Sequence, residues 1–424
     1  MYCGSCLRDN ALAAALIRRG HDVVLSPVYT PTRTDERNVS AEHVFFGGIS
    51  VFLEQHVPVF RYTPHALDRL WDSTWALRLA SKRQIKVDPK SLGELTVSML
   101  KGEHGFQAKE IAKLLDWLRS EPPFDLIVIP YSLLLGLAEP LKRELKAPVG
   151  CTLQGDDFFL DGLGPSYKRQ SLDLIRAASR YVDAFFPVSD YYREFMPRYL
   201  GISTERMFVI PIAISLDGYS PRKTTRVGDF TVGYLARIAP EKGLHVLCDA
   251  YVRLRSTSGA EKARLVAAGY LPPEHEGYLN QARSILRKAG LEAEFEYRGE
   301  VDRAEKIRFL QGLDVLSVPT VYEEPKGMFL LEAMACGVPV VQPRRGAFPE
   351  IVAKTGGGVI VAADDPTALA DGVLGLWRDP AKAAELGRSG TAGVRQHYSV
   401  EVVAEIAEDV YVSVAGRSAN RLVS

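Results

Sequence analysis

Residues 323–341 read EEPKGMFLLEAMACGVPVV and join a turn, a short helix and the start of a buried strand. The Pro and Gly mark the turn, and the apolar spacing predicts a helix over about 328–336. Glu324 then lies in the loop before the helix, and Glu332 lies about one turn inside it. Both carboxylates can therefore face one ligand that lies across the helix N-terminus.

Carboxylates suit sugar hydroxyls, because each oxygen accepts charge-assisted hydrogen bonds that contribute about 1.5–3 kcal/mol each. The alternative is a pair of surface carboxylates, with Glu332 interacting with the dipole of its own helix. The spacing of these two residues alone does not separate the alternatives.

Strand and helix patterns alternate on both sides of this stretch. Nearly continuous apolar runs are typical of parallel strands that helices cover on both faces. In the second half of the chain the runs are FTVGYLA (230–236), ARLVAAG (263–269), FEYRGEV (295–301), DVLSVPT (314–320), VPVVQP (338–343) and GGVIVAA (357–363). In the first half they are HDVVLSPV (21–28), FDLIVIPY (124–131), PVGCTL (148–153), AFFPVS (184–189) and MFVIPIAI (207–214).

This repetition predicts an α/β protein with two doubly wound, Rossmann-like domains that face each other across a cleft, with a polar linker at 220–229. We expect an N-terminal domain over 1–215 and a second domain over 216–398. A C-terminal helix over 399–424 would pack back towards the first domain. Ligands in such folds bind outside the carboxyl ends of the strands.

The composition of the whole chain narrows the class of protein. Of 424 residues, 46% are apolar and 25% are charged, and 52 basic residues balance 52 acidic ones. Zero formal charge argues against a broad surface for nucleic acid. The apolar run 126–138 is too short and too interrupted to span a bilayer, and no signal peptide pattern is present. With five cysteines and no disulfide framework, we expect a cytoplasmic protein.

One segment breaks the alternation. Residues 56–120 hold more helical pattern than a simple crossover needs, which predicts a helical insertion. Its first part, 56–90, has a net positive charge and several interleaved aromatic residues. It is either a site for an anionic acceptor or a peripheral membrane contact, or a solvated amphipathic insertion.

A second motif, YLARIAPEKG, occupies residues 234–243. It places Arg237 after a strand and Lys242 just inside a helix that Pro240 can open. Two cations beside the positive end of a helix form a site for a diphosphate. The alternative is a pair of solvated basic side chains.

Together, these motifs resemble the donor domain of the retaining family 4 glycosyltransferases of GT-B fold, in the superfamily of glycogen and sucrose synthases. The matching segments are Arg237…Lys242-Gly243, Arg298-Gly299-Glu300-Val301, the paired glutamates with EAMACGVPVV, and GAFPEIV (346–352). In the first half, residues 10–24 and VSDYYREFM (188–196) are similar to the family more loosely. The resemblance implies an enzyme that moves a sugar from a nucleotide-diphosphate sugar to an unknown acceptor, which is a glycan, a lipid-linked molecule or a small molecule.

The resemblance also implies roles for single residues. Arg237 and Lys242 would bind the donor diphosphate and Glu324 would hold the transferred sugar, as the catalytic set. Glu332 would accept hydrogen bonds from the ribose diol. The other residues on the donor side would be Gly327, Met328, Phe329, Arg298, Gly299 and Val301, and those on the acceptor or sugar side Gly4, Ser5, Gln154 and Lys326.

Fixed cations and a helix dipole can stabilise the departing diphosphate, so no metal ion and no cofactor are expected. Asp156-Asp157 and Asp364-Asp365 lack the Asp-x-Asp pattern of metal-dependent transferases, and the second pair is typical of a helix start before Pro366. The family implies retention of anomeric configuration, with the leaving phosphate helping to deprotonate the acceptor on the same face.

The sequence departs from the family pattern at two site positions. Lys326 stands where many members have an aromatic residue, and it either contacts a phosphate or an acidic sugar or points to solvent. Gln154 stands where the family commonly has His, and an amide hydrogen-bonds a sugar but does not titrate.

The chain also begins inside the glycine-rich loop that precedes the family's first helix. The family's first strand is therefore absent, and we expect about 15–20 further residues before Met1 in the native protein, because that strand is central in a doubly wound sheet. Cys3 and Cys6 fall in this loop; a disulfide or a redox or metal site is the alternative to a loop role.

Two rival functions remain open. A GT-B enzyme that epimerises or hydrolyses nucleotide sugars would release free sugar without an acceptor. A catalytically inactive nucleotide-sugar-binding protein would bind the donor and show no turnover.

Overall fold

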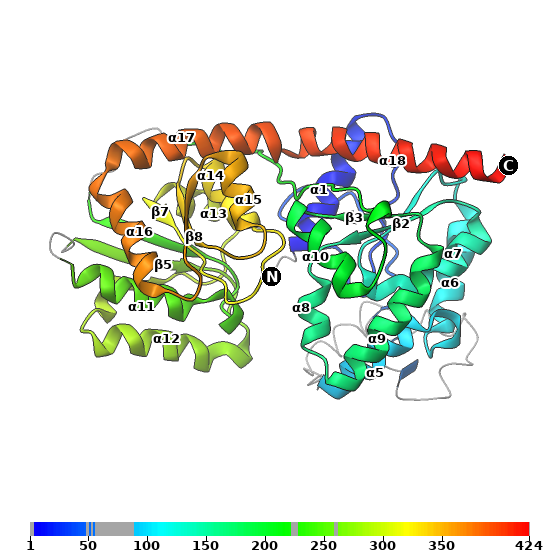
Figure 1. Cartoon of the computed structure of the whole chain (residues 1–424), viewed down its shortest axis with the longest axis horizontal. Coiled ribbons are helices and arrows are strands. Elements are labelled where there is room, and N and C mark those ends of the chain that lie inside the picture. Colours follow the sequence, from blue (N-terminus) through cyan, green and yellow to red (C-terminus); the bar gives the residue numbers. More distant parts are fainter. Residues whose placement is uncertain are drawn as a thin grey trace. The chain divides into compact units, whose positions relative to one another are not determined.

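The computed structural model describes residues 4–47, 51, 54–55, 89–221, 228–257 and 262–423. The chain divides into two compact units (Figure 1). The C-terminal unit comprises residues 1–12 and 211–404, and the N-terminal unit comprises residues 13–210 and 405–424. Across the described residues, the search for a helix with the length and apolarity of a bilayer span finds none.

The C-terminal unit is built on a parallel sheet of six strands in the order β6-β5-β4-β7-β8-β9. The strands are β4 (Phe230–Leu235), β5 (Ala263–Ala268), β6 (Phe295–Tyr297), β7 (Val315–Leu316), β8 (Val340–Pro343) and β9 (Gly358–Val361). In chain order this is 3-2-1-4-5-6, the arrangement of dinucleotide-binding sheets. All six apolar runs predicted in this half form strands, although β6 and β7 are shorter than predicted.

Helices cover both faces of this sheet. They are α11 (Leu244–Arg255), α12 (Glu276–Lys288), α13 (Arg303–Gln311), α14 (Met328–Ala335), α15 (Phe348–Thr355), α16 (Pro366–Arg378) and α17 (Pro380–His397). Figure 1 shows α11 and α12 on one face and α13, α14, α15 and α17 on the other. The apolar α14 is buried along almost its whole length, because α17 covers the side that faces away from the sheet.

The strand order fixes where a ligand can bind. β4 pairs with β5 on one side and with β7 on the other, so the chain winds away from β4 in both directions. The loops that follow β4 and β7 therefore leave the same edge of the sheet at its topological switch point, where such folds bind ligands. The two motifs singled out in the sequence, after residues 235 and 316, are these two loops.

The loop after β4 passes very close to the loop after β7. Pro240–Lys242 form a 3-10 turn, so Lys242 lies just before α11 rather than inside it as predicted. Gly243 ends this turn with φ 75°, and a Cβ atom there would lie 1.8 Å from the carbonyl oxygen of Pro319. Only glycine combines this backbone conformation with this approach.

The N-terminal unit contains a parallel sheet of three strands in the order β1-β2-β3, among the described residues. Its elements are α1 (Gly4–Arg18, shared with the other unit), α5 (Pro89–Leu100), α6 (Ala108–Ser120), β1 (Ile127–Ile129), α7 (Ala138–Leu145), β2 (Val149–Leu153), α8 (Asp156–Asp161), α9 (Pro165–Ala178), β3 (Ala184–Pro187) and α10 (Asp190–Leu200). β2, in the middle, is fully buried.

Two predicted strands of this half do not form. Residues 21–28 make single bridges, Leu25 to Ser40 and Val28 to Phe45, and residues 207–214 make single bridges at their two ends. A strand needs a neighbouring strand along its whole length, which an apolar run does not guarantee. In the second run, Pro211 also lacks the backbone N–H that would donate a hydrogen bond to a neighbouring strand. Of the predicted insertion 56–120, residues 56–88 lie outside the described residues, as does Cys3.

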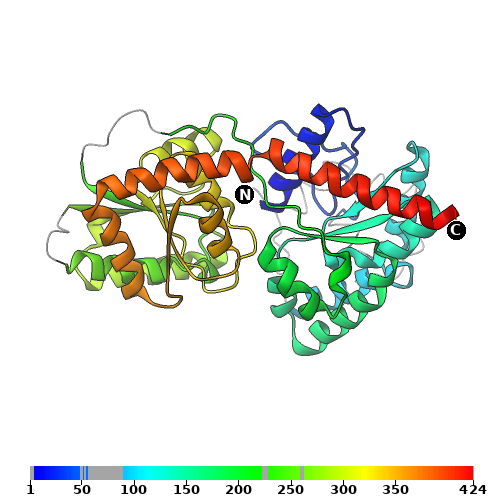
Figure 2. The same cartoon turned by 45° about the horizontal axis from the view of Figure 1, so that its top comes forward.

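The last helix, α18 (Val400–Val423), starts in the C-terminal unit, and its later part belongs to the N-terminal unit. Arg19 pairs with Glu405 at 3.2 Å and with Glu408 at 2.6 Å, and the ring of Tyr411 packs edge-on against Phe186. Figure 2 shows this part of α18 running along the N-terminal unit.

We predict that Gly243→Ala lowers the free energy of unfolding by about 2–4 kcal/mol, because the methyl group meets a backbone oxygen at a positive φ. Urea denaturation measures the change. Gly375→Ala is the control: this exposed glycine of α16 has open space around its Cβ position, and alanine there should stabilise by about 0.5–1 kcal/mol. Equal effects of the two substitutions would contradict the close approach.

Candidate functional site

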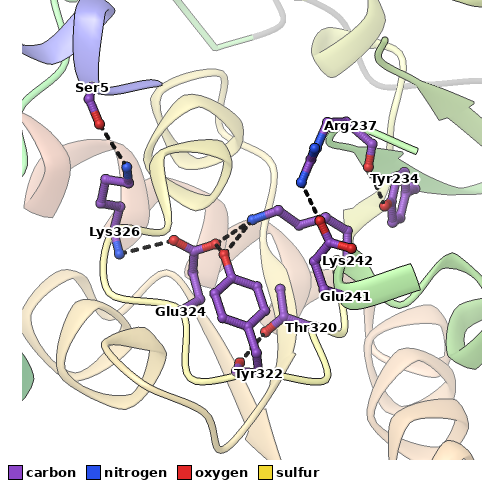
Figure 3. A network of polar contacts seen from close by, with 9 residues as sticks. All are labelled: Ser5, Tyr234, Arg237, Glu241, Lys242, Thr320, Tyr322, Glu324 and Lys326. Carbon is purple, nitrogen blue, oxygen red and sulfur yellow. Dashed lines mark hydrogen bonds and ion pairs between the residues drawn. The ribbon is translucent and has the colours of Figure 1, made fainter. Parts of the chain in front are cut away.

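A buried ion pair lies at the switch point of the C-terminal unit (Figure 3). Glu324 is 3% exposed, and its Oε2 lies 2.5 Å from Nζ of Lys242. The hydroxyl of Tyr322 donates to the same Oε2 and accepts a hydrogen bond from Lys242 at 2.6 Å. The backbone N–H of Lys326 donates to Oε1 at 3.2 Å. Residues from the loops after β4 and β7 thus form one network.

The charge state of Glu324 follows from these contacts. Burial by itself raises the pKa of this carboxyl, but the ammonium groups of Lys242 and Lys326 and the hydrogen bonds from Lys242 and Tyr322 outweigh burial and hold the pKa at about 2. Glu324 is therefore an anion at any physiological pH. It can accept hydrogen bonds but has no proton to donate.

Arg237 lies in the same loop as Lys242 but has another partner. Its Nη2 donates to the carboxylate of Glu241, and its carbonyl oxygen accepts a hydrogen bond from the hydroxyl of Tyr234 at 3.2 Å. The side chain of Arg237 is about one-third exposed. A ligand can therefore reach this guanidinium at the cost of sharing it with Glu241.

The start of α14 lies next to the ion pair. Gly327 precedes the helix with φ 62°, which directs the chain from the loop into the helix. The N–H groups of Met328 and Phe329 belong to the first turn, where a helix has no internal acceptors for them. Nζ of Lys242 lies 5.9 Å from the ring centre of Phe329. The site therefore combines a cation with the positive end of a helix.

Glu332, on the first turns of α14, has partners that the sequence did not reveal. Its Oε1 accepts hydrogen bonds from Nζ of Lys306 at 2.7 Å and from the hydroxyl of Tyr219 at 3.0 Å. Nζ of Lys306 and the guanidinium of Arg303 also lie over the ring of Tyr219. Both bonds fall on one oxygen, so Oε1 is anchored by protein groups.

The loop 298–301 also lies at the carboxyl edge of the sheet, after β6. The side chain of Arg298 pairs with Glu296 at 3.0 Å, and its guanidinium lies over the ring of Phe309. The carbonyl oxygen of Gly299 accepts from the N–H of Gly269 at 2.8 Å. Among the contacts of the described residues, none joins Arg298, Gly299 or Val301 to the network of Glu324, so their assignment to the donor side stays a prediction.

The predicted acceptor-side residues are only partly brought together. Nζ of Lys326 donates to Oγ of Ser5 at 3.0 Å, so this lysine does not simply point to solvent. A Cβ atom at Gly4 would lie 3.3 Å from Sδ of Met328. Gln154 belongs to the N-terminal unit, where its Nε2 donates to the carbonyl oxygen of Pro130 at 3.1 Å.

Glu323 is a further residue that the sequence analysis did not single out. Its carboxylate accepts from the N–H of Gly346 at 2.5 Å and from Nη1 of Arg345 at 3.0 Å. The N–H of Ala347 also donates to the carbonyl oxygen of Glu324 at 2.9 Å. Adjacent glutamates thus have separate partners: Glu323 holds the loop after β8, and Glu324 belongs to the network of Lys242. The pattern EE carries no signal that separates them.

The paired aspartates have structural partners. Asp365 caps α16 by accepting the N–H groups of Thr367 and Ala368, which confirms the predicted helix start. Asp156 accepts from the N–H and hydroxyl of Ser132, and Asp157 accepts from the hydroxyl of Tyr192. In the described ranges no group of three His, Cys, Asp or Glu side chains is placed to hold a metal ion.

Comparison with known proteins follows this division of the chain. The model "Glycosyl transferase 4-like domain" matches residues 9–213, and the model "Glycosyl transferases group 1" matches residues 219–392. The chain belongs to the family 4 type of GT-B glycosyltransferases.

Sequence relatives agree with this assignment. A phosphatidyl-myo-inositol mannosyltransferase of Mycobacterium leprae is 31% identical over 233 residues, which are 54% of this chain and 58% of that protein. The chain spans about half the length of the curated relatives it matches.

Solved structures show the same GT-B fold. Anabaena HepE in complex with UDP matches this chain with a TM-score of 0.63 at 19% identity, over 74% of this chain and 84% of that one. Sucrose-phosphate synthase from Thermosynechococcus elongatus gives 0.62 at 20% identity, over 73% and 79%.

We predict that Glu324→Gln removes a pH-dependent part of the stability. The folded pKa lies below the unfolded value, so ionised Glu324 stabilises the fold above the unfolded pKa of 4.5, and this stabilisation is lost as the pH falls towards 2. By pH 3 the advantage of the wild type over Glu324→Gln should shrink by about 2 kcal/mol.

Urea denaturation at pH 7, 5, 4 and 3 measures this difference. Glu385→Gln, at an exposed position of α17, is the control for removing a carboxylate. A difference between wild type and Glu324→Gln that stays constant between pH 5 and pH 3 would contradict the low pKa.

Proposed function

We propose that this glycosyltransferase moves a sugar from a nucleotide-diphosphate sugar to an acceptor, with retention of anomeric configuration and without a divalent cation. The observation that carries the proposal is the contact of Lys242 with Glu324 at the switch point. In a glycosyl diphosphate, the phosphate oxygens and the sugar hydroxyls are neighbours. A cation for the phosphate directly beside a carboxylate for the hydroxyls matches that arrangement.

The chemistry of transfer needs groups that stabilise charge as it develops. Cleavage of the anomeric bond leaves positive charge on the sugar ring and negative charge on the diphosphate. Lys242, Arg237 and the N-terminus of α14 would face the diphosphate, and they are held in place before the reaction. Because Glu324 stays ionised, it would bind the sugar and not act as an acid. The leaving phosphate is the base that we assign to the acceptor hydroxyl.

The nucleoside would be held by Glu332. Its Oε1 is fixed by Lys306 and Tyr219. Within the described part of the chain Oε2 has no protein partner, so it can accept hydrogen bonds from a ribose diol. The loop 298–301 is at the same edge of the sheet and would cover the base.

The Anabaena structure is a complex with UDP, which makes UDP the first nucleotide to test. The basic segment 56–90 is a further proposed place for an anionic acceptor or a membrane surface.

We predict that UDP or another nucleoside diphosphate raises the unfolding temperature of the wild type, and that Glu332→Ala binds the same nucleotide about 10–100-fold more weakly, because charged hydrogen bonds are lost. Thermal shift across nucleotide concentrations gives both values. Glu385→Ala, on α17, is the matched control and should bind like the wild type. If no nucleotide stabilises the wild type, the proposed function is wrong; full affinity of Glu332→Ala would contradict only the ribose assignment.

We also predict that EDTA leaves the transfer rate unchanged and that the product keeps the anomeric configuration of the donor. EDTA should have no effect because Lys242 and Arg237 would stabilise the diphosphate in place of a metal ion. Proton NMR of the product reads the anomeric coupling, and the same spectra detect free sugar. Free sugar in the absence of acceptor would point to hydrolysis, and donor binding without any product would point to an inactive binding protein.

A further inference from the structure

Arg8, in the second turn of α1, is a buried cation that the proposed mechanism does not use. Its side chain is 3% exposed, and Nη1 donates to Oδ1 of Asp9 at 2.9 Å. Among the residues that the structure describes, Nε and Nη2 of Arg8 have no hydrogen-bond partner. Nε and Nη2 are thus buried away from water, and no described protein group accepts a hydrogen bond from them.

Such an arrangement destabilises the protein unless a ligand completes it. Buried donors without acceptors cost free energy, and the cost is larger for charged groups. The first turn of α1 contains no acidic residue, so Arg8 also lies near the uncompensated positive end of a helix. Both features favour an anion at this place.

The two unpaired groups have a specific geometry. Nε and Nη2 lie on one edge of the guanidinium and direct two N–H bonds in parallel. This fork matches two oxygens of one phosphate or carboxylate. Nη1, on the opposite side, is the group that Asp9 holds, so Asp9 fixes the guanidinium while Nε and Nη2 have no acceptor among the described residues.

The same face of α1 is tied to the sugar-holding loop. Ser5 lies three residues before Arg8 and therefore on the same side of the helix. Its hydroxyl accepts from Nζ of Lys326, whose backbone N–H donates to Glu324 (Figure 3). The ammonium group of Lys326 is thus a second cation, next to Ser5 at the first turn of α1. The charge of Lys326 is shared with Glu324 and that of Arg8 with Asp9, but both cations lie near the positive end of α1, an arrangement that suits the near-double charge of a phosphate ester.

We propose that Nε and Nη2 of Arg8 bind a phosphate group carried by the acceptor of the sugar. The proposal rests on the proposed function for the sugar transfer. The phosphate belongs either to a soluble ester or to a lipid headgroup, and both present the same oxygens to the guanidinium.

To test whether Arg8 binds a phosphate, binding of the probes is measured on protein saturated with UDP, because UDP fills the phosphate site of the donor. The soluble probes are glycerol 3-phosphate and uncharged glycerol, measured by calorimetry. The lipid probes are phosphatidylcholine vesicles with and without phosphatidic acid, measured by flotation. The wild type should bind one phosphate probe and neither uncharged control. Arg8→Gln should bind that probe about 10–100-fold more weakly, and Arg8→Lys, which keeps the charge and loses the fork, should fall between them.

The variants also separate binding from a structural role. Arg8→Gln removes unpaired charged groups, so without ligand its unfolding temperature should equal or exceed that of the wild type, and its affinity for UDP should be unchanged. Arg388→Gln, at an exposed position of α17, controls for the loss of one positive charge and should bind the probe normally.

Several outcomes would overturn the proposal. They are failure of the wild type to bind either phosphate probe, unchanged affinity of Arg8→Gln, or misfolding of both Arg8 variants, which would make Arg8 structural. Each leaves the proposed function intact as long as UDP still stabilises the wild type. Failure of UDP itself to bind would refute the proposed function instead.

Discussion

The ion pair of Lys242 and Glu324 is the constraint on which the site depends. A buried pair of charges contributes favourably only if its geometry is good and its remaining atoms are hydrogen-bonded, because removing both ions from water is costly. Tyr322 and the N–H of Lys326 supply those bonds. The pair joins residues 82 positions apart, and it forms because β4 and β7 are neighbours in the sheet. The strand order therefore places the site, and the glycine turn at Gly243 allows the close approach.

The loop that carries Glu324 is fixed from several sides. Glu323 binds Arg345 and the N–H of Gly346, which follow β8, while the carbonyl oxygen of Glu324 accepts from Ala347. The loop after β7 is thus tied both to the loop after β4 and to the loop after β8. Side chains held in this way need little reorganisation when a ligand binds, and preorganised charges are the ones that contribute most to catalysis.

The sequence predicted those parts of the structure that depend on neighbours along the chain. The loop and helix at 323–341 and the strands of the C-terminal unit are of this kind, because local spacing and apolar runs determine them. Partners far apart in sequence were not predictable: Tyr219 and Lys306 meet Glu332 across 113 and 26 positions, and no pattern marks a tyrosine or a lysine for a distant carboxylate. The prediction of a strand over 21–28 was wrong for a related reason, since an apolar run does not show which strand it pairs with; in the structure Val24 is exposed and only Pro27 of this run is buried.

The two glutamates of the motif, Glu324 and Glu332, are chemically identical, but they leave different numbers of hydrogen-bond acceptor positions for a ligand. A carboxylate has about four acceptor positions. In the described part of the chain Glu324 uses two on Oε2, for Lys242 and Tyr322, and one on Oε1, for the N–H of Lys326. One position then remains, so a sugar can add a single hydrogen bond to Glu324 without displacing a protein donor. Glu332 keeps the whole of Oε2. In the proposed binding mode, a nucleoside would bind Glu332 without displacing a protein donor, whereas every sugar hydroxyl beyond the first would compete with Lys242, Tyr322 or Lys326 for Glu324.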